Sequence, residues 1–280
     1  MYFLALLLVC GLMWLAPLRR GLPVDVPRLW IDFTARWADR GPWLVMLLAL
    51  LPLVPLALLQ WWLASQSLGL LLLLLSALVL LACMGRRDPL EGMTAEFEAA
   101  LARGDQQAAL QLVEQDLGAP VPADADGTLP PLVAAARSAL LHEVLHGYVV
   151  TVFWFVLLGP VGALGYRLLH LLTERQASPQ AGPAPALVHA LEWLPARLLA
   201  VSFALVGHFD HVRDALAGAL LSWDVSADEL VDRTAVAALS GGQGSLADED
   251  DTGALADTRT LLKRALLAWA VVMALLVVLG

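Results

Sequence analysis

The chain has 280 residues, of which 59% are hydrophobic and 15% are charged, and its formal net charge is −9. Soluble domains are about 45–50% apolar and about 25% charged, so this composition favours a membrane protein. The acidic balance excludes nucleic-acid binding, which requires a basic surface.

Six apolar blocks are long enough, or nearly long enough, to cross a bilayer as helices. A spanning helix needs about 20 mostly apolar residues, with a range of about 17–25. We expect the first block to be a retained helix rather than a cleaved signal peptide, because its basic residues follow the apolar run. The fifth block is the least regular, since it contains His189, Glu192 and Arg197. The blocks cover residues 1–18, 43–59, 68–84, 147–166, 187–206 and 265–280.

The placement of arginine predicts the orientation of these spans. If all six cross, residues 19–42, 85–146 and 207–264 lie on one side and hold 14 of the 17 basic residues. Cytoplasmic loops of membrane proteins carry the excess of lysine and arginine, so this side is predicted to be cytoplasmic. Both chain ends then face outward, and the expected location is a bacterial inner membrane.

The expected organisation has five parts, defined by these spans and loops. They are three N-terminal spans with the cytoplasmic loop 19–42 (residues 1–84), a cytoplasmic helical insertion (85–146), a transmembrane core (147–206), a cytoplasmic segment with a flexible acidic loop (207–264) and a C-terminal span (265–280).

The insertion is predicted to begin with a helical hairpin. Asp88 and Pro89 are the residue types of an N-cap and a first helical position. Apolar residues then recur at helical spacing on both sides of a break at Arg103-Gly104-Asp105. We expect the rest of the membrane domain to cover this apolar stripe, and another protein is the alternative. The stripe comprises Leu90, Met93, Phe97 and Leu101 before the break, and Leu110, Val113 and Leu117 after it.

His142, Glu143 and His146 form an H-E-x-x-H pattern at the cytoplasmic mouth of the fourth span. On a helix this spacing puts two imidazoles one turn apart, with a glutamate that can activate a zinc-bound water. With His208 as a third ligand, a zinc hydrolase is one alternative function. We nevertheless expect no metal or other cofactor, because the pattern is short and no fixed third-ligand motif follows it.

Glu192 and Arg197 lie inside the fifth span, on either side of Pro195. Ionisable groups within a bilayer are costly and generally face a bundle interior or a wet cavity. They are about 140° apart on an ideal helix, so each needs a partner on another element. Such residues either hold helices together or contact a ligand. We expect the second role for Arg197, because Trp193, Pro195 and Arg197 form one compact group around a predicted kink.

Two stretches together resemble a known family. They are Phe153-Trp154-Phe155, Gly159-Pro160, Gly162-Ala163-Leu164 and Tyr166-Arg167, followed by Leu191-Glu192-Trp193-Leu194-Pro195-Ala196-Arg197-Leu198. They look like the core signature of the AmpE family, inner-membrane proteins encoded beside the cytosolic amidase AmpD and associated with β-lactamase induction. The same core is similar to the CobD/CbiB membrane proteins, which form an amide bond in cobalamin synthesis. The Gly-Pro pair predicts a kink in the fourth span.

The resemblance implies an all-α polytopic bundle of about six spans with a cytoplasmic helical hairpin. It implies a non-enzymatic regulatory protein that modulates β-lactamase induction linked to cell-wall recycling. Membrane lipids, an anionic amphiphilic ligand and a functional link to AmpD are the expected partners. No residue is expected to be catalytic, and the candidate ligand-binding residues are Arg197, Glu192, Trp193, Trp154, Arg167, His142, Glu143 and His146.

One departure from the related CobD-type proteins bears on activity. Those proteins carry a Glu-Asn pair and an Asp at the positions where this chain has His142, Glu143 and His146. The replacement argues against the corrinoid enzyme. A CobD-like enzyme acting on another amphiphilic substrate is the second alternative function.

Overall fold

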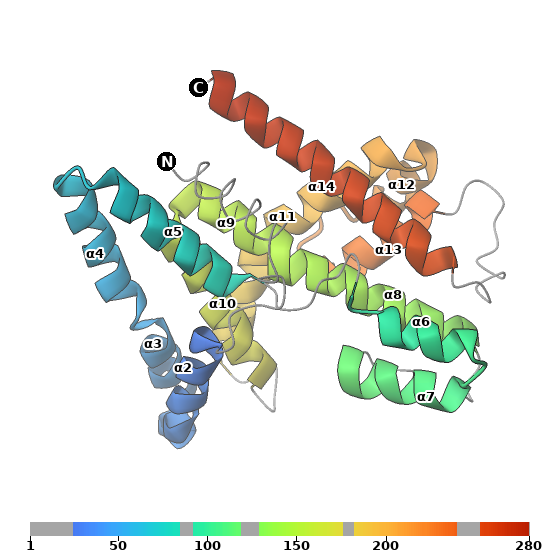
Figure 1. Cartoon of the computed structure of the whole chain (residues 1–280), viewed down its shortest axis with the longest axis horizontal. Coiled ribbons are helices and arrows are strands. Elements are labelled where there is room, and N and C mark those ends of the chain that lie inside the picture. The colour runs from blue at the N-terminus through green and yellow to red at the C-terminus, as the bar shows by residue number, and fades with distance from the viewer. Residues whose placement is uncertain (1–24, 85–91, 119–128, 176–181, 240–252, 280) are drawn as a thin grey trace. The chain divides into compact units, whose positions relative to one another are not determined.

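The computed structural model describes residues 25–84, 92–118, 129–175, 182–239 and 253–279 (Figure 1). Within these ranges every regular element is a helix and no strand occurs, which confirms the all-α class. The predicted span at 1–18 and the predicted cap at Asp88 and Pro89 lie outside the described residues. The chain divides into two compact units, one of Met1–Arg86 with His146–Pro195 and the other of Arg87–Leu145 with Ala196–Gly280.

The first unit consists of helices that pack around buried apolar residues of α10. The core joins residues of α2, α3, α10 and α11, among them Ile31, Ala49, Leu168, Leu172 and Val188. The elements are α2 (Val26–Thr34), the 3-10 segment η2 (Ala35–Arg40), α3 (Pro42–Leu50), α4 (Leu53–Ser65), α5 (Gly69–Cys83), the π segment η4 (Leu145–Val149), α9 (Val150–Leu158), α10 (Pro160–Arg175) and α11 (Ala184–Val206), whose second half belongs to the other unit.

A proline divides the helical segment predicted at 43–59 into α3 and α4. Pro52 has no backbone N–H, so it cannot donate to the carbonyl four residues earlier. The indole Nε1 of Trp30 instead donates to the carbonyls of Leu48 and Ala49, each at 3.2 Å. The Leu48 carbonyl also accepts from the Leu51 backbone N–H at 3.2 Å, so Trp30 on α2 adds hydrogen bonds at the end of α3, where the helical ladder is interrupted.

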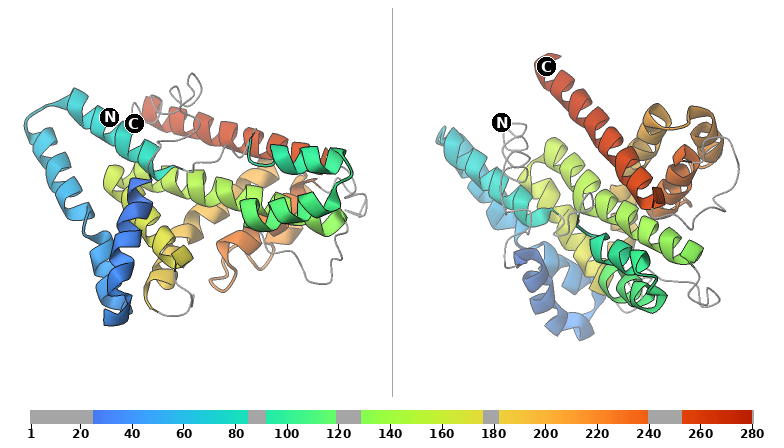
Figure 2. Two further views of the ribbon diagram at one scale, coloured as in Figure 1. Left: turned by 60° about the horizontal axis from the view of Figure 1, so that its bottom comes forward. Right: turned by 45° about the vertical axis from the view of Figure 1, so that its right-hand side comes forward.

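Three helical segments are long and apolar enough to cross a membrane, by length and composition. They are Pro42–Ser65, Leu129–Leu158 and Ala184–Val206, and a shorter apolar helix covers Gly69–Cys83. Large apolar side chains stand outward on α4 and α5, as Trp61 and Leu70 do at 70% and 72% exposed. A lipid environment would cover such a surface, which in water would favour aggregation. Figure 2 shows α4 and α5 meeting at a sharp turn. The total of six spans remains a prediction.

The fourth apolar block differs from the expectation in both position and shape. The long helical segment runs over Leu129–Leu158 rather than over residues 147–166. The expected kink at Gly159 and Pro160 is a complete break, because Gly159 adopts φ 70° and ψ −156°, a conformation open essentially only to glycine. Pro160 then starts α10, since its missing N–H is not needed at a first helical position.

The turn between α9 and α10 makes Gly162 a position of close backbone approach. A Cβ atom there would lie 2.6 Å from both Leu158 Cβ and the Trp154 carbonyl oxygen.

We predict that Gly162→Ala lowers the free energy of unfolding by about 1–3 kcal/mol, measured by thermal unfolding in detergent. Gly165→Ala is the control and should be nearly neutral, because the nearest atom to its Cβ would be Leu53 Cδ1 at 3.4 Å. Equal stability of both variants would contradict the close approach.

The second unit contains the predicted helical hairpin, and its own chain covers the apolar stripe. Phe97, Val113, Leu132, Ala136 and Leu255 form one buried cluster, so residues of the insertion itself and of the segment predicted at 207–264 cover the stripe, where the rest of the membrane domain was expected to do so. The elements are α6 (Ala95–Ala102), α7 (Gln106–Gln111), the π segment η3 (Leu112–Leu117), α8 (Leu129–Val144), α12 (Phe209–Leu216), α13 (Ala227–Leu239) and α14 (Gly253–Leu279).

The predicted break in the hairpin is confirmed. α6 ends at Ala102, Gly104 has a positive φ of 73°, and Asp105 accepts a 3.0 Å hydrogen bond from Ala108 N as the N-cap of α7. Asp at this position satisfies an N–H that the first turn of a helix leaves unpaired. Arg259 of α14 also contacts Glu98 of α6, which ties the hairpin to the last helix of the unit.

Candidate functional site

Four polar side chains from three segments meet inside the first unit. His146 lies in the π segment η4, Tyr166 and His170 lie on α10, and Glu192 lies on α11. Tyr166 and His170 are four residues apart, so they project from the same face of their helix. A π segment within a helix often marks a functional position, and here it carries His146. We call these four residues the polar cluster.

One carboxylate oxygen of Glu192 is the centre of the polar cluster. The Tyr166 hydroxyl donates to Glu192 Oε1 at 2.8 Å, and His146 Nδ1 lies 2.9 Å from the same oxygen. His170 Nδ1 is 3.4 Å from it, and His146 Nδ1 is also 3.0 Å from the Tyr166 hydroxyl. Because the Tyr166 hydrogen is directed to Glu192, the hydrogen between the other pair belongs to His146.

The polar cluster is almost completely buried. The side chains of His146 and His170 are 13% exposed, that of Glu192 is 9% exposed, and the residue Tyr166 is 1% exposed. An isolated carboxylate is very unfavourable in such surroundings, whereas one that accepts several hydrogen bonds can remain charged. The neighbours of Glu192 therefore offset the cost of placing its charge within an apolar helical segment.

A second carboxylate, that of Glu174, contacts the other ring nitrogen of His170. His170 Nε2 lies 3.2 Å from Glu174 Oε1, one helical turn further along α10. This hydrogen bond lowers the pKa of the Glu174 carboxyl below its usual value, which keeps Glu174 charged. The His170 ring stacks on the His146 ring with 4.6 Å between their centroids. His170 Nδ1 is buried and has no hydrogen-bond partner.

The H-E-x-x-H pattern divides between two groups of contacts. His146 belongs to the polar cluster, while His142 Nε2 lies 3.1 Å from Asp232 Oδ2 in the second unit. Within the described ranges, the group of ligand atoms close enough to share a metal ion comprises His146, His170 and Glu192. It includes neither His142 nor His208, so the zinc hydrolase alternative loses two of its three expected ligands.

The contacts of His142 do not form a catalytic triad. Ser138 Oγ donates to Asp232 Oδ2 at 2.6 Å and lies 3.3 Å from His142 Nε2. In a triad, the histidine uses one nitrogen for the nucleophile and the other for the carboxylate. Here Ser138 and Asp232 both meet the same nitrogen, so the carboxylate cannot orient the ring for proton transfer from the serine.

Arg197 donates to backbone carbonyls of the connection between α12 and α13. Its Nε donates to the carbonyl of Leu220 at 3.0 Å, and one terminal nitrogen donates to the carbonyls of Ser222 and Val225. The residue is 4% exposed. These carbonyls lie between α12 and α13, so Arg197 joins α11 to that connection within the second unit. Of the two roles left open by the sequence, this arrangement favours holding helical elements together.

The remaining sequence-predicted residues lie at separate positions. Trp154 Nε1 donates to the carbonyl of Leu191 at 3.0 Å, which links α9 to α11 in the first unit. Arg167 has a buried Nε without a hydrogen-bond partner. Trp193 and Glu143 are half-buried. Tyr166 was quoted in the family signature but not proposed as a site residue, and His170 was missed.

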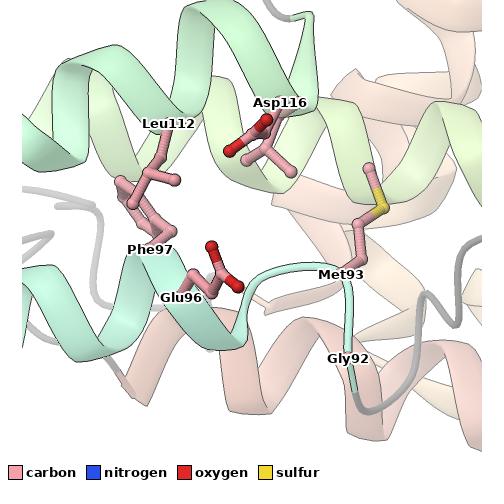
Figure 3. Close-up of a pocket in the computed structure, with 7 residues that line it drawn as sticks. Gly92, Met93, Glu96, Phe97, Leu112 and Asp116 are labelled. Carbon is pink, nitrogen blue, oxygen red and sulfur yellow. The ribbon is translucent and has the colours of Figure 1, made fainter.

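A surface cavity of about 370 Å³ lies in the second unit, beside the helical hairpin (Figure 3). Met93 and Phe97 line it from the side of α6, and Leu112 lines it from η3. Two exposed residues with carboxylate side chains, Glu96 and Asp116, also line it. Exposed acidic groups are ordinary on a protein surface, so the cavity alone does not define a site.

The fold and the polar cluster define a class of all-α, membrane-associated proteins with ionisable groups buried among apolar helices. A family model described as "Regulatory signalling modulator protein AmpE" matches residues 26–280. The chain therefore belongs to the AmpE family, as its resemblance to that family predicted. Comparisons with curated proteins and with solved structures found no match.

Proposed function

We propose that this chain is a multi-pass inner-membrane regulator that modulates β-lactamase induction, and that its regulatory activity depends on the polar cluster. The observation that carries the proposal is Glu192, a buried carboxylate on a membrane-length helix that is surrounded by two histidines and a tyrosine. Ionisable groups at such positions are generally retained for function. Family membership supplies the regulatory role, and the predicted arginine bias supplies the orientation.

The partners of this regulator are part of the proposal. Membrane lipids would contact the exposed apolar helices, and we infer a functional link to the amidase AmpD from the resemblance to the family. An anionic amphiphilic ligand would now depend on Arg167, whose buried Nε has no hydrogen-bond partner, because Arg197 donates to backbone carbonyls.

Complementation tests the proposed function. The host is a strain with an inducible β-lactamase that lacks its own member of this family, and β-lactamase activity is measured with and without a β-lactam inducer. We expect the wild-type chain to restore the parental induction level and to be recovered in the inner-membrane fraction. The same fraction from cells with the empty vector is the control. An unchanged induction level in cells that hold the chain in the inner membrane would contradict the proposal.

A further inference from the structure

The polar cluster has the composition of a metal site that differs from the H-E-x-x-H pattern. Two histidines and one glutamate form a ligand set that zinc enzymes use, and the same set suits other divalent transition metals. The three ligand atoms, His146 Nδ1, His170 Nδ1 and Glu192 Oε1, all lie within 4.8 Å of one another. We propose that these three residues bind a divalent transition-metal ion, with zinc as the representative ion.

The separations of the ligand atoms fit one ion. Two atoms that are each about 2.1 Å from a zinc ion lie about 3.4 Å apart at a tetrahedral angle. Glu192 Oε1 is 2.9 Å from His146 Nδ1 and 3.4 Å from His170 Nδ1. The two rings are stacked, so small rotations about χ2, a broad torsion for histidine, would direct both nitrogen lone pairs toward the same ion.

The surroundings of His170 provide a second, independent observation. Its Nδ1 faces the polar cluster, is buried and makes no hydrogen bond. Its Nε2 is held by Glu174 at 3.2 Å. Histidines that bind metals almost always donate their other ring N–H to a carboxylate or carbonyl, which orients the ring and raises its basicity. Glu174 therefore prepares His170 to present Nδ1 as a ligand.

A bound ion would take the place of the hydrogen on His146 Nδ1. In the metal-free arrangement the hydrogen on His146 Nδ1 points at the Tyr166 hydroxyl and Glu192. A histidine ligates through a nitrogen that carries no hydrogen, so metal binding at Nδ1 requires the His146 tautomer whose one ring hydrogen is on Nε2. The Tyr166 hydroxyl keeps its hydrogen bond to Glu192 and stabilises the liganded carboxylate. One ion would then join η4, α10 and α11.

This inference rests on the proposed function, because it names the ligand of the same polar cluster, but its test is separate. The full chain is purified in detergent with a tag that contains no histidine, treated with a chelator and equilibrated with zinc. Metal is then measured by elemental analysis after size-exclusion chromatography. We expect one zinc per chain for the wild type, and nearly none for Glu192→Gln and His170→Gln. His142→Gln is the matched control and should keep one zinc, because His142 contacts Asp232 instead.

A further variant separates metal binding from a merely structural role. Glu174→Gln leaves all three ligands in place, and we expect it to weaken zinc affinity by about 10–100-fold without altering the metal-free melting temperature. Zinc should raise the melting temperature of the wild type, since a ligand stabilises the state that binds it. Absence of zinc from the folded wild type, or an unchanged zinc content in His170→Gln, would overturn the inference. The proposed function would still stand if the wild type complements induction without binding metal.

Discussion

Replacing Arg197 with alanine should destabilise the protein more than any other single substitution considered above. The guanidinium donates to the carbonyls of Leu220, Ser222 and Val225, and the residue is 4% exposed. Leaving buried carbonyls without this donor costs about 1–3 kcal/mol for each that water cannot reach. We therefore expect Arg197→Ala to lower the free energy of unfolding by about 2–5 kcal/mol, seen as reduced membrane levels and a lower melting temperature in detergent.

Lysine at this position should recover part of the loss. It keeps the charge, but its donors lie on a single nitrogen and cannot reproduce the planar fork of arginine. The control is Arg213→Ala on α12, an arginine whose partners Asp210 and Asp214 are mostly exposed. Surface ion pairs contribute about 0–1 kcal/mol, so this variant should be nearly neutral. An Arg197→Ala protein with wild-type stability that fails to support induction would instead indicate that Arg197 contacts a ligand.

The role of Arg197 shows where reasoning from the sequence ends. Its burial was foreseeable, because a charge inside an apolar helix needs a partner. The partners, however, are backbone carbonyls 23 to 28 residues further along the chain. A carbonyl has no residue-type signature, so no pattern of side chains could identify it in advance.

The α-helical class was predictable because it depends on the presence of long apolar blocks. An error in the first or last residue of a block does not change the predicted class. The sequence did not predict that the chain breaks, rather than kinks, after α9. Gly159 and Pro160 are compatible with a kink and with a turn between two helices, and the choice depends on the positive φ of Gly159, which a glycine allows but does not require. The predicted span at 147–166 therefore joined parts of two different helices.

Half of the polar cluster was within reach of the sequence. His146 stood in a recognisable motif and Glu192 was an ionisable residue in an apolar block, so both were proposed. His170 was missed because it lies between the apolar blocks at 147–166 and 187–206, whereas α10 continues to Arg175. A signal did exist. Tyr166, His170 and Glu174 recur every four residues, which places a polar face on one side of a helix.

His170 offers the cleanest separation of function from stability within the polar cluster. Its Nδ1 makes no hydrogen bond, so a substitution that keeps a polar group there should disturb folding less than the loss of Glu192 would. Gln can still donate to Glu174, but it cannot reproduce the imidazole ring stacked on His146. We expect His170→Gln to reach the membrane at the wild-type level and to fail in the induction assay.

The direct test of the polar cluster as the functional centre compares two histidines of this chain in that assay. His170→Gln and His142→Gln are expressed in the strain that lacks its own family member, and induced β-lactamase activity is normalised to the amount of chain in the inner membrane. His142 is the matched residue, because it also pairs with a carboxylate but lies in the other unit. The predicted result is loss of induction control in His170→Gln and wild-type behaviour in His142→Gln. Full complementation by His170→Gln at a normal membrane level would contradict the assignment.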